Sequence, residues 1–113
     1  MKHEMRLHNE PFELIKNGTK TIELRLNDEK RQLINIGDVI EFENRTTLEK
    51  ISVKVINLHK YNSFEDLYKH FDKISMGYSE DEEANPKDIE KYYSKEEQNK
   101  YDVVGIEMKL IEK

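Results

Sequence analysis

The sequence predicts an α+β fold, a small β-barrel of mixed or antiparallel strands with flanking helices. Three observations support this prediction. Four or five stretches alternate apolar and polar residues, helical patterns are inserted between strands rather than after each one, and the last strand must pair with early ones. The 113 residues suit one compact domain spanning residues 1–113, because two cores of ordinary size would not fit.

The first part of the chain is predicted to form a strand, a helix and a second strand. Met5 and Leu7 alternate with polar neighbours and indicate a short opening strand. Pro11 favours the start of a helix, and Gly18 is placed to end that helix in a left-handed conformation. Residues 20–26 alternate cleanly, with three apolar side chains on one face and a threonine, a glutamate and an arginine on the other.

The middle of the chain predicts two further strands after a short helical turn at residues 30–34. The first strand covers residues 39–43, and the second and longer one covers residues 51–58. In the longer strand the apolar positions change phase after Val55, because Ile56 falls on the opposite face. We therefore expect a β-bulge at this point.

The last part of the chain predicts helical turns and a closing strand. Ser63 can cap a helix whose apolar residues continue at a period near 3.6 as far as Ile74. Asn85-Pro86 begins another turn, and residues 94–97 (S-K-E-E) have the capping-box pattern. Residues 104–110 alternate again and predict the closing strand.

Composition narrows the function classes. The formal net charge is −5, and residues 79–97 carry eight acids against three lysines, which accounts for all of it. We call residues 79–97 the acidic segment and expect residues 80–83 to form a solvated loop. The remaining chain is neutral, which suits a selective cleft for one or a few nucleotides better than a long basic groove.

Several kinds of site are excluded or disfavoured by the residues present. The chain has no cysteine, which excludes a disulfide scaffold, a thiolate metal site and a cysteine nucleophile. The four histidines lack metal-ligand spacing, and no glycine-rich phosphate loop occurs, so we expect no metal and no cofactor. No apolar run is long enough to span a membrane, and the start does not resemble a signal peptide. We therefore expect a cytoplasmic protein.

The most informative stretch is residues 18–28. Thr21, Glu23 and Arg25 share the face of a strand opposite its apolar face, and Lys20 stands at the junction that precedes them. A carboxylate two residues from a guanidinium can fix the arginine and leave donors free for a phosphate or a base edge. The alternative is an exposed cross-strand ion pair of little energetic value.

The same stretch resembles a known family. G-x-K-T-x-E-x-R at residues 18–25, followed by I-G-D-x-I-x-F at residues 36–42, is similar to the ASCH domain (activating signal cointegrator homology) of the PUA-like superfamily. S-F-x-x-L at residues 63–67 and Y-x-V-V-G-I at residues 101–106 extend the resemblance over essentially the whole chain. The first motif is moderately specific, whereas the second is a common barrel pattern.

The resemblance implies a PUA-like β-barrel with a cleft beside the Lys20–Arg25 strand. Most such proteins are proposed to bind RNA or a nucleotide there, and the motif nominates Lys20, Thr21, Glu23 and Arg25 as ligand-binding residues. Lys20 and Arg25 would hold a phosphate or a carbonyl oxygen, and Glu23 would orient Arg25 or accept a hydrogen bond from a base. Gly37 and Asp38 match as well, the glycine for turn geometry.

One branch of the family implies an alternative function, a small amidohydrolase that acts on acylated cytidine. Its motif has a lysine, which Lys20 matches, and a threonine nucleophile three residues later, where this chain has Glu23. A carboxylate does not replace a hydroxyl in forming an ester intermediate, but a Lys20/Glu23 pair could activate water as a general base. The branch's downstream glutamate has only imprecise matches: Glu65, Asp66 and Asp72.

The sequence leaves open the roles of three tyrosines and of one basic pair. Tyr92, Tyr93 and Tyr101 could stack on a base, or they could pack on the barrel with their hydroxyls outward. Lys30 and Arg31 could extend a basic rim, or they could be ordinary solvated surface. The sequence also allows an interaction module without a small ligand. We expect RNA or a nucleoside or nucleotide as the ligand, and no membrane partner.

Overall fold

The computed structural model describes residues 1–112 and confirms the α+β class. Its elements include one short 3₁₀ helix, η1. In chain order they are β1 (Lys2–Leu7), α1 (Asn9–Lys16), β2 (Ile22–Leu26), η1 (Arg31–Leu33), β3 (Val39–Asn44), β4 (Lys50–Tyr61), α2 (Phe64–Leu67), α3 (Lys73–Met76), α4 (Lys87–Glu90), α5 (Lys95–Tyr101) and β5 (Val103–Glu112).

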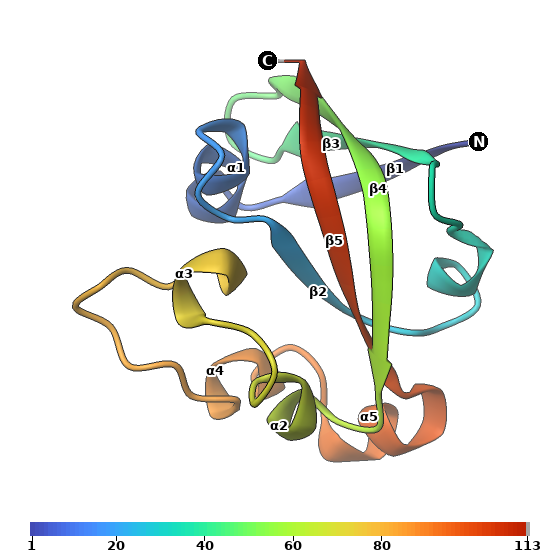
Figure 1. The fold of residues 1–113 in the computed structure, drawn as a ribbon, viewed down its shortest axis with the longest axis vertical. Helices are drawn as coiled ribbons and strands as arrows, with labels where there is room; N and C mark the ends of the chain where they lie inside the picture. Colours follow the sequence, from blue (N-terminus) through green and yellow to red (C-terminus); the bar gives the residue numbers. More distant parts are fainter. Residues whose placement is uncertain (113) are drawn as a thin grey trace.

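The five strands form one curled, mixed sheet in the order β1-β3-β4-β5-β2. β1 runs parallel to β3, and the other three neighbouring pairs are antiparallel. The closing strand β5 lies between β4 and the early strand β2, as the sequence predicted. β1 and β2 are the two edges of the sheet, so the backbone forms a half-barrel that is open between them (Figure 1).

The long strand β4 contains the predicted bulge. Its pairing register with β5 shifts between Val55 and Asn57, and the inserted residue, Ile56, is 42% exposed while Val55 is fully buried. The bulge lets one strand pair with β3 through its first half and with β5 along its length. The edge between β1 and β2 is open because these two strands do not pair with each other.

Two apolar clusters hold the fold together. The larger one fills the inside of the curled sheet with side chains from β1, α1, β3, β4 and β5. The smaller one joins β2 and the start of β5 to the helical segment, and α2, α4 and α5 gather at that end of the sheet (Figure 1). Gln98 lies fully buried there, where its side-chain oxygen accepts from the Phe64 backbone and its amide donates to Glu90 and to the Tyr93 carbonyl. The helical segment is therefore fixed to the sheet by packing and by a satisfied polar core.

Two predicted elements differ in the structure. The helix expected to run from Ser63 to Ile74 is broken into α2 and α3, because the Asp72 carboxylate accepts from the Ser75 amide and starts a new helix there. The strand expected from residue 20 begins at Ile22. The other predicted turns are present, including the left-handed Gly18 (φ +85°) and the capping box at Ser94.

Candidate functional site

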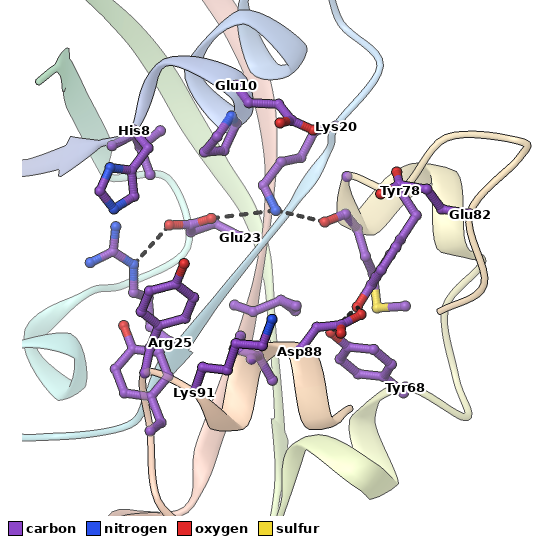
Figure 2. Close-up of a pocket in the computed structure, with 18 of the residues that line it drawn as sticks. His8, Glu10, Lys20, Glu23, Arg25, Tyr68, Tyr78, Glu82, Asp88 and Lys91 are labelled. Atoms are coloured by element: carbon purple, nitrogen blue, oxygen red, sulfur yellow. Dashed lines mark hydrogen bonds and ion pairs between the residues drawn. The ribbon is translucent and has the colours of Figure 1, made fainter. Parts of the chain in front are cut away.

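A cavity of about 660 Å³ opens beside β2, and we call it the main cavity. One side is formed by the end of β1 and the start of α1, and the other by the helical segment from Tyr68 to Tyr93 (Figure 2). Its charged lining residues are Arg6, His8, Glu10, Lys20, Glu23, Arg25, Arg45, Glu82, Asp88 and Lys91. This volume lies within the range of small-molecule sites in proteins.

Three charged side chains of the predicted motif form a buried row in this cavity. The Lys20 Nζ lies 3.5 Å from Glu23 Oε1, and the Arg25 Nε donates to Glu23 Oε2 at 2.8 Å. The exposed fractions of the three side chains are 6%, 7% and 14%. Figure 2 shows the carboxylate of Glu23 between the two cations. We call this arrangement the buried charge row.

The row perturbs the proton affinities of its members. Burial lowers the pKa of the Lys20 ammonium, since Glu23 offsets only part of the lost solvation. Burial alone would raise the pKa of Glu23, but Arg25 and Lys20 outweigh it and hold the pKa of this carboxyl below its usual range. Glu23 is therefore a carboxylate held ionised between two cations, which suits it to positioning Arg25 and makes it a weak general base.

Lys20 is anchored from the other side by the end of α3. Its Nζ donates to the Met76 carbonyl at 2.8 Å, a carbonyl left unpaired at the helix C-terminus. The next residue, Gly77, has φ +108°, and a Cβ there would lie 3.2 Å from the Lys20 Cδ. The turn after α3 thus fits closely around the lysine and fixes the ammonium group at the cavity.

Arg25 lies at the open edge of the half-barrel. Its Nη2 donates to the Arg6 carbonyl at 3.3 Å, which joins edge strand β2 to edge strand β1 by a side chain rather than by backbone pairing. The interaction with Glu23 and this bond occupy two of the five N–H donors of the guanidinium. Arg25 has no other hydrogen-bond acceptor within the described residues, so three donors remain for a ligand.

The far side of the cavity carries a tyrosine pair and a carboxylate that sequence reasoning missed. The Tyr78 hydroxyl donates to Asp88 Oδ2 at 2.9 Å and lies 2.9 Å from the Tyr68 hydroxyl (Figure 2). Burial, together with these hydrogen bonds, raises the pKa of Tyr78 well above its ordinary value. Both residues of the tyrosine pair lie in helical or loop positions without periodicity, so no sequence pattern marked them.

Comparison with known protein families shows to which family this chain belongs. A family model for the ASCH domain matches residues 5–112. The chain belongs to the ASCH domain family. Proteins of this family broadly resemble RNA-binding proteins. No curated protein matches the chain.

Several solved structures are similar to this ASCH domain. The crystal structure of hypothetical protein PH0355 is 36% identical, with a TM-score of 0.78, over 98% of this chain and 100% of that one. The solution NMR structure of protein PF0455 from Pyrococcus furiosus is 35% identical, with a TM-score of 0.72, over 100% of both chains. ASCH from Zymomonas mobilis, at 14% identity and a TM-score of 0.70, covers 96% of this chain and 66% of its own and supports the fold alone. The α+β fold expected from the motifs is confirmed, and the curled half-barrel sheet is consistent with a PUA-like fold.

Not every residue nominated by the ASCH motif lies at the cavity. Lys20, Glu23 and Arg25 line it, but Thr21 does not. The Thr21 amide donates to the Ser75 carbonyl, and its carbonyl accepts from the Met108 amide. Thr21 therefore joins α3 to β5 through its backbone.

The residues considered for a downstream catalytic carboxylate also lie outside the main cavity. Glu65, Asp66 and Asp72 are absent from its lining, and Asp72 is used to cap α3. Gly37 and Asp38 are likewise elsewhere, with Asp38 Oδ2 2.8 Å from the His3 Nε2. Within residues 1–112 no three histidine or acidic side chains are grouped so that they could hold a metal ion.

The three tyrosines weighed for base stacking separate in the structure. Tyr92 lines the cavity and is 68% exposed, so its ring is accessible. Tyr93 lines the cavity too, but its ring stacks on Phe64 with centroids 5.7 Å apart. Tyr101 packs on the smaller apolar cluster and is absent from the lining. Tyr92 is therefore the tyrosine available for stacking.

The acidic segment forms part of the cavity wall. Residues 80–83 are exposed, as expected, and Lys73 holds the loop by donating to the carbonyls of Glu80 and Glu82 at 2.7 Å each. Two of the segment's acids, Glu82 and Asp88, line the cavity on the side opposite Arg25. The described residues include no helix long and apolar enough to cross a membrane.

Proposed function

We propose that the main cavity of this ASCH domain binds one nucleotide unit, either free or as part of a single-stranded RNA. The observation that carries the proposal is the buried charge row, because it presents fixed cationic donors in a cavity that also has apolar and aromatic walls. A buried charge costs free energy unless it has a partner. Arg25 already has Glu23 as its partner and still has unused N–H donors, so it is suited to bind an anionic ligand.

The two sides of the cavity differ in charge, and this suggests how a nucleotide would lie. Arg25 and Arg45 offer guanidinium groups for phosphate oxygens near the open edge of the sheet. Asp88 offers a carboxylate acceptor on the opposite side, where an exocyclic amino group of a base could donate. The exposed ring of Tyr92 supplies a stacking surface between water and the cavity.

Isothermal titration calorimetry with the four ribonucleoside 5′-monophosphates at low salt tests the proposal. We expect binding that weakens with salt and is reduced about tenfold by Arg45→Gln and by Tyr92→Ala, two exposed lining residues whose loss leaves the buried charge row intact. Lys109→Gln, an exposed lysine on β5 outside the cavity, is the matched control and should bind as the wild type does. Undetectable binding of all four nucleotides, or equal affinities in all variants, contradicts the proposal.

The hydrolase alternative rests on one observation, the lysine of lowered pKa beside a carboxylate. Lys20 could polarise a substrate carbonyl, but the lowered pKa of Glu23 makes this neighbouring carboxylate a weaker base. Incubation with an N4-acylated cytidine at high protein concentration separates the two functions. Release of cytidine that is lost in Lys20→Met would establish the hydrolase, and the absence of turnover alongside nucleotide binding would leave binding as the function.

A further inference from the structure

A second cavity of about 470 Å³ shares part of its lining with the main cavity. It is bounded by β1, β3, the start of β4 and the segment that carries η1. Its lining consists of Glu4, Met5, Arg6, Arg25, Lys30, Arg31, Glu41, Glu43, Arg45 and Lys50. Six of these residues are basic and three are acidic, whereas the main cavity has five lysines and arginines against four acids. The second cavity is therefore the more cationic of the two.

Two of the three acids of the second cavity are already paired. Glu43 lies 3.4 Å from the Arg6 Nε, and Glu41 lies 3.2 Å from the ammonium of Lys2, which is outside the cavity. The Lys50 ammonium makes looser contacts with the same two carboxylates, at 3.9 Å and 4.0 Å. Lys30 and Arg45 have no ion pair within the described part of the chain. Their charges are therefore available to an anion that enters the cavity.

Arg31 provides a second and independent sign of a missing acceptor. Its Nη1 lies 3.3 Å from Asp28 Oδ2, and its side chain is only 15% exposed. Its Nε is fully buried and has no hydrogen-bond partner within the described residues. A buried donor without an acceptor costs free energy, and a phosphate oxygen would satisfy it once the guanidinium turned toward the cavity.

The two cavities are continuous through shared arginines. Arg6, Arg25 and Arg45 line both, and the Arg25 side chain bridges the open edge to the Arg6 carbonyl. A phosphate held by Arg25 in the main cavity would thus stand at the entrance to the second one. The half-barrel's open edge is the route by which a ligand could pass from one to the other.

We propose that the second cavity is a phosphate-binding site, so that the preferred ligand is a nucleotide carrying at least a second phosphate group. This inference rests on the proposed function of the main cavity. The nucleotide unit occupies the main cavity, and the next phosphate is held by Lys30, Arg31 and Lys50 across the open edge. A dinucleotide of RNA and a nucleoside diphosphate share this chemistry, and both are therefore measured.

The test compares three ligands that carry the same base, the one bound best as a 5′-monophosphate. They are the monophosphate, the 5′-phosphorylated dinucleotide and the nucleoside 5′-diphosphate. We expect one or both of the longer ligands to bind at least about tenfold more tightly than the monophosphate, with a steeper dependence on salt. The tighter of the two identifies whether the second phosphate comes from an RNA chain or from a diphosphate.

The double variant Lys30→Gln/Lys50→Gln removes two exposed charges that line only the second cavity. It should weaken the tighter long ligand about tenfold, reduce its salt slope by about 2 and change monophosphate affinity less than about twofold. The double variant Lys54→Gln/Lys109→Gln removes the same charge from exposed positions on β4 and β5 and should change nothing. Arg31→Lys keeps the charge but loses the buried Nε donor, and should also weaken only the long ligand.

The outcomes distinguish failure of this inference from failure of the proposed function. Equal affinities for all three ligands, or equal effects of the two double variants, overturn the second site and leave the main cavity as proposed. A loss of monophosphate binding in Lys30→Gln/Lys50→Gln that matches the loss for the long ligand also overturns it. If the wild type binds none of the three ligands, both proposals fall.

Discussion

Replacing Glu23 by glutamine removes the only anion of the buried charge row while keeping its shape. At an effective dielectric constant of about 20, Coulomb attraction is about 5 kcal/mol at 3.5 Å and about 6 kcal/mol at 2.8 Å, the two distances from Glu23 to Lys20 and Arg25. Desolvation offsets much of this attraction, and breaking a buried pair has a net cost of about 3–5 kcal/mol. Because the amide still accepts hydrogen bonds, we expect the free energy of unfolding to fall by about 3 kcal/mol.

Thermal and urea unfolding followed by circular dichroism measure this loss. For a chain of this size about 3 kcal/mol corresponds to a fall in Tm of about 12 °C. The matched control is Glu43→Gln, which removes one partner of the exposed Arg6 pair, and it should cost only about 0–1 kcal/mol. A loss for Glu23→Gln no larger than that of the control would refute the reasoning about the row.

The pH dependence of the same variant provides a second check. The folded pKa of Glu23 is below its ordinary value of 4.5, so the stability that the ionised carboxylate provides is complete above about pH 4.5 and is lost at lower pH. The difference between wild type and Glu23→Gln should therefore shrink as the pH falls below about 4.5. Lys20, deprived of Glu23, should have a still lower pKa than in the wild type, so the variant should gain stability from a lower pH onward, and by more than the wild type, as the pH rises toward 10.5.

Two further substitutions test other parts of the structure. His3, followed by a backbone amide, holds the pKa of Asp38 at about 2. Asp38→Asn should therefore lower the Tm at pH 7, and the deficit should diminish between about pH 4 and pH 2; a deficit that does not change over that range would count against the contact. Gly77→Ala places a Cβ at φ +108° beside Lys20, and we expect urea titration to show a loss of about 1–2 kcal/mol, whereas an unchanged midpoint would mean that the turn relaxes freely.

The sheet could be predicted from the sequence because the alternation of apolar and polar residues in a strand shows which of its faces is buried. Alternation located β2, β3 and β5, and the change of phase after Val55 located the bulge in β4. The sequence also predicted that the last strand pairs with early ones, and β5 pairs with β2. The break between α2 and α3 could not be predicted, because the apolar residues keep a period of 3.6 through it. The break comes from a local hydrogen bond, in which the Asp72 carboxylate accepts from the Ser75 amide and begins α3.

The contact between Glu23 and Arg25 could be predicted because the two residues lie on one strand. Glu23 and Arg25 are two residues apart on β2, so their contact is a matter of strand geometry. The bond from Lys20 to the Met76 carbonyl and the contact of Tyr78 with Asp88 depend on loops that have no sequence period. Thr21 illustrates the opposite error, because position in a motif does not determine whether a side chain reaches the cavity.

The uneven distribution of charge along the chain also predicts the orientation of the proposed ligand in the main cavity. All of the net charge of −5 belongs to residues 79–97, and this acidic segment contributes Glu82 and Asp88 to one side of the main cavity. The open edge on the other side leads to a second cavity with an excess of three basic residues in its lining. A phosphate chain would be repelled by the first side and attracted to the second. A nucleotide in the main cavity should therefore place its base toward Asp88 and extend its phosphates past Arg25, because the reverse orientation sets anion against anion.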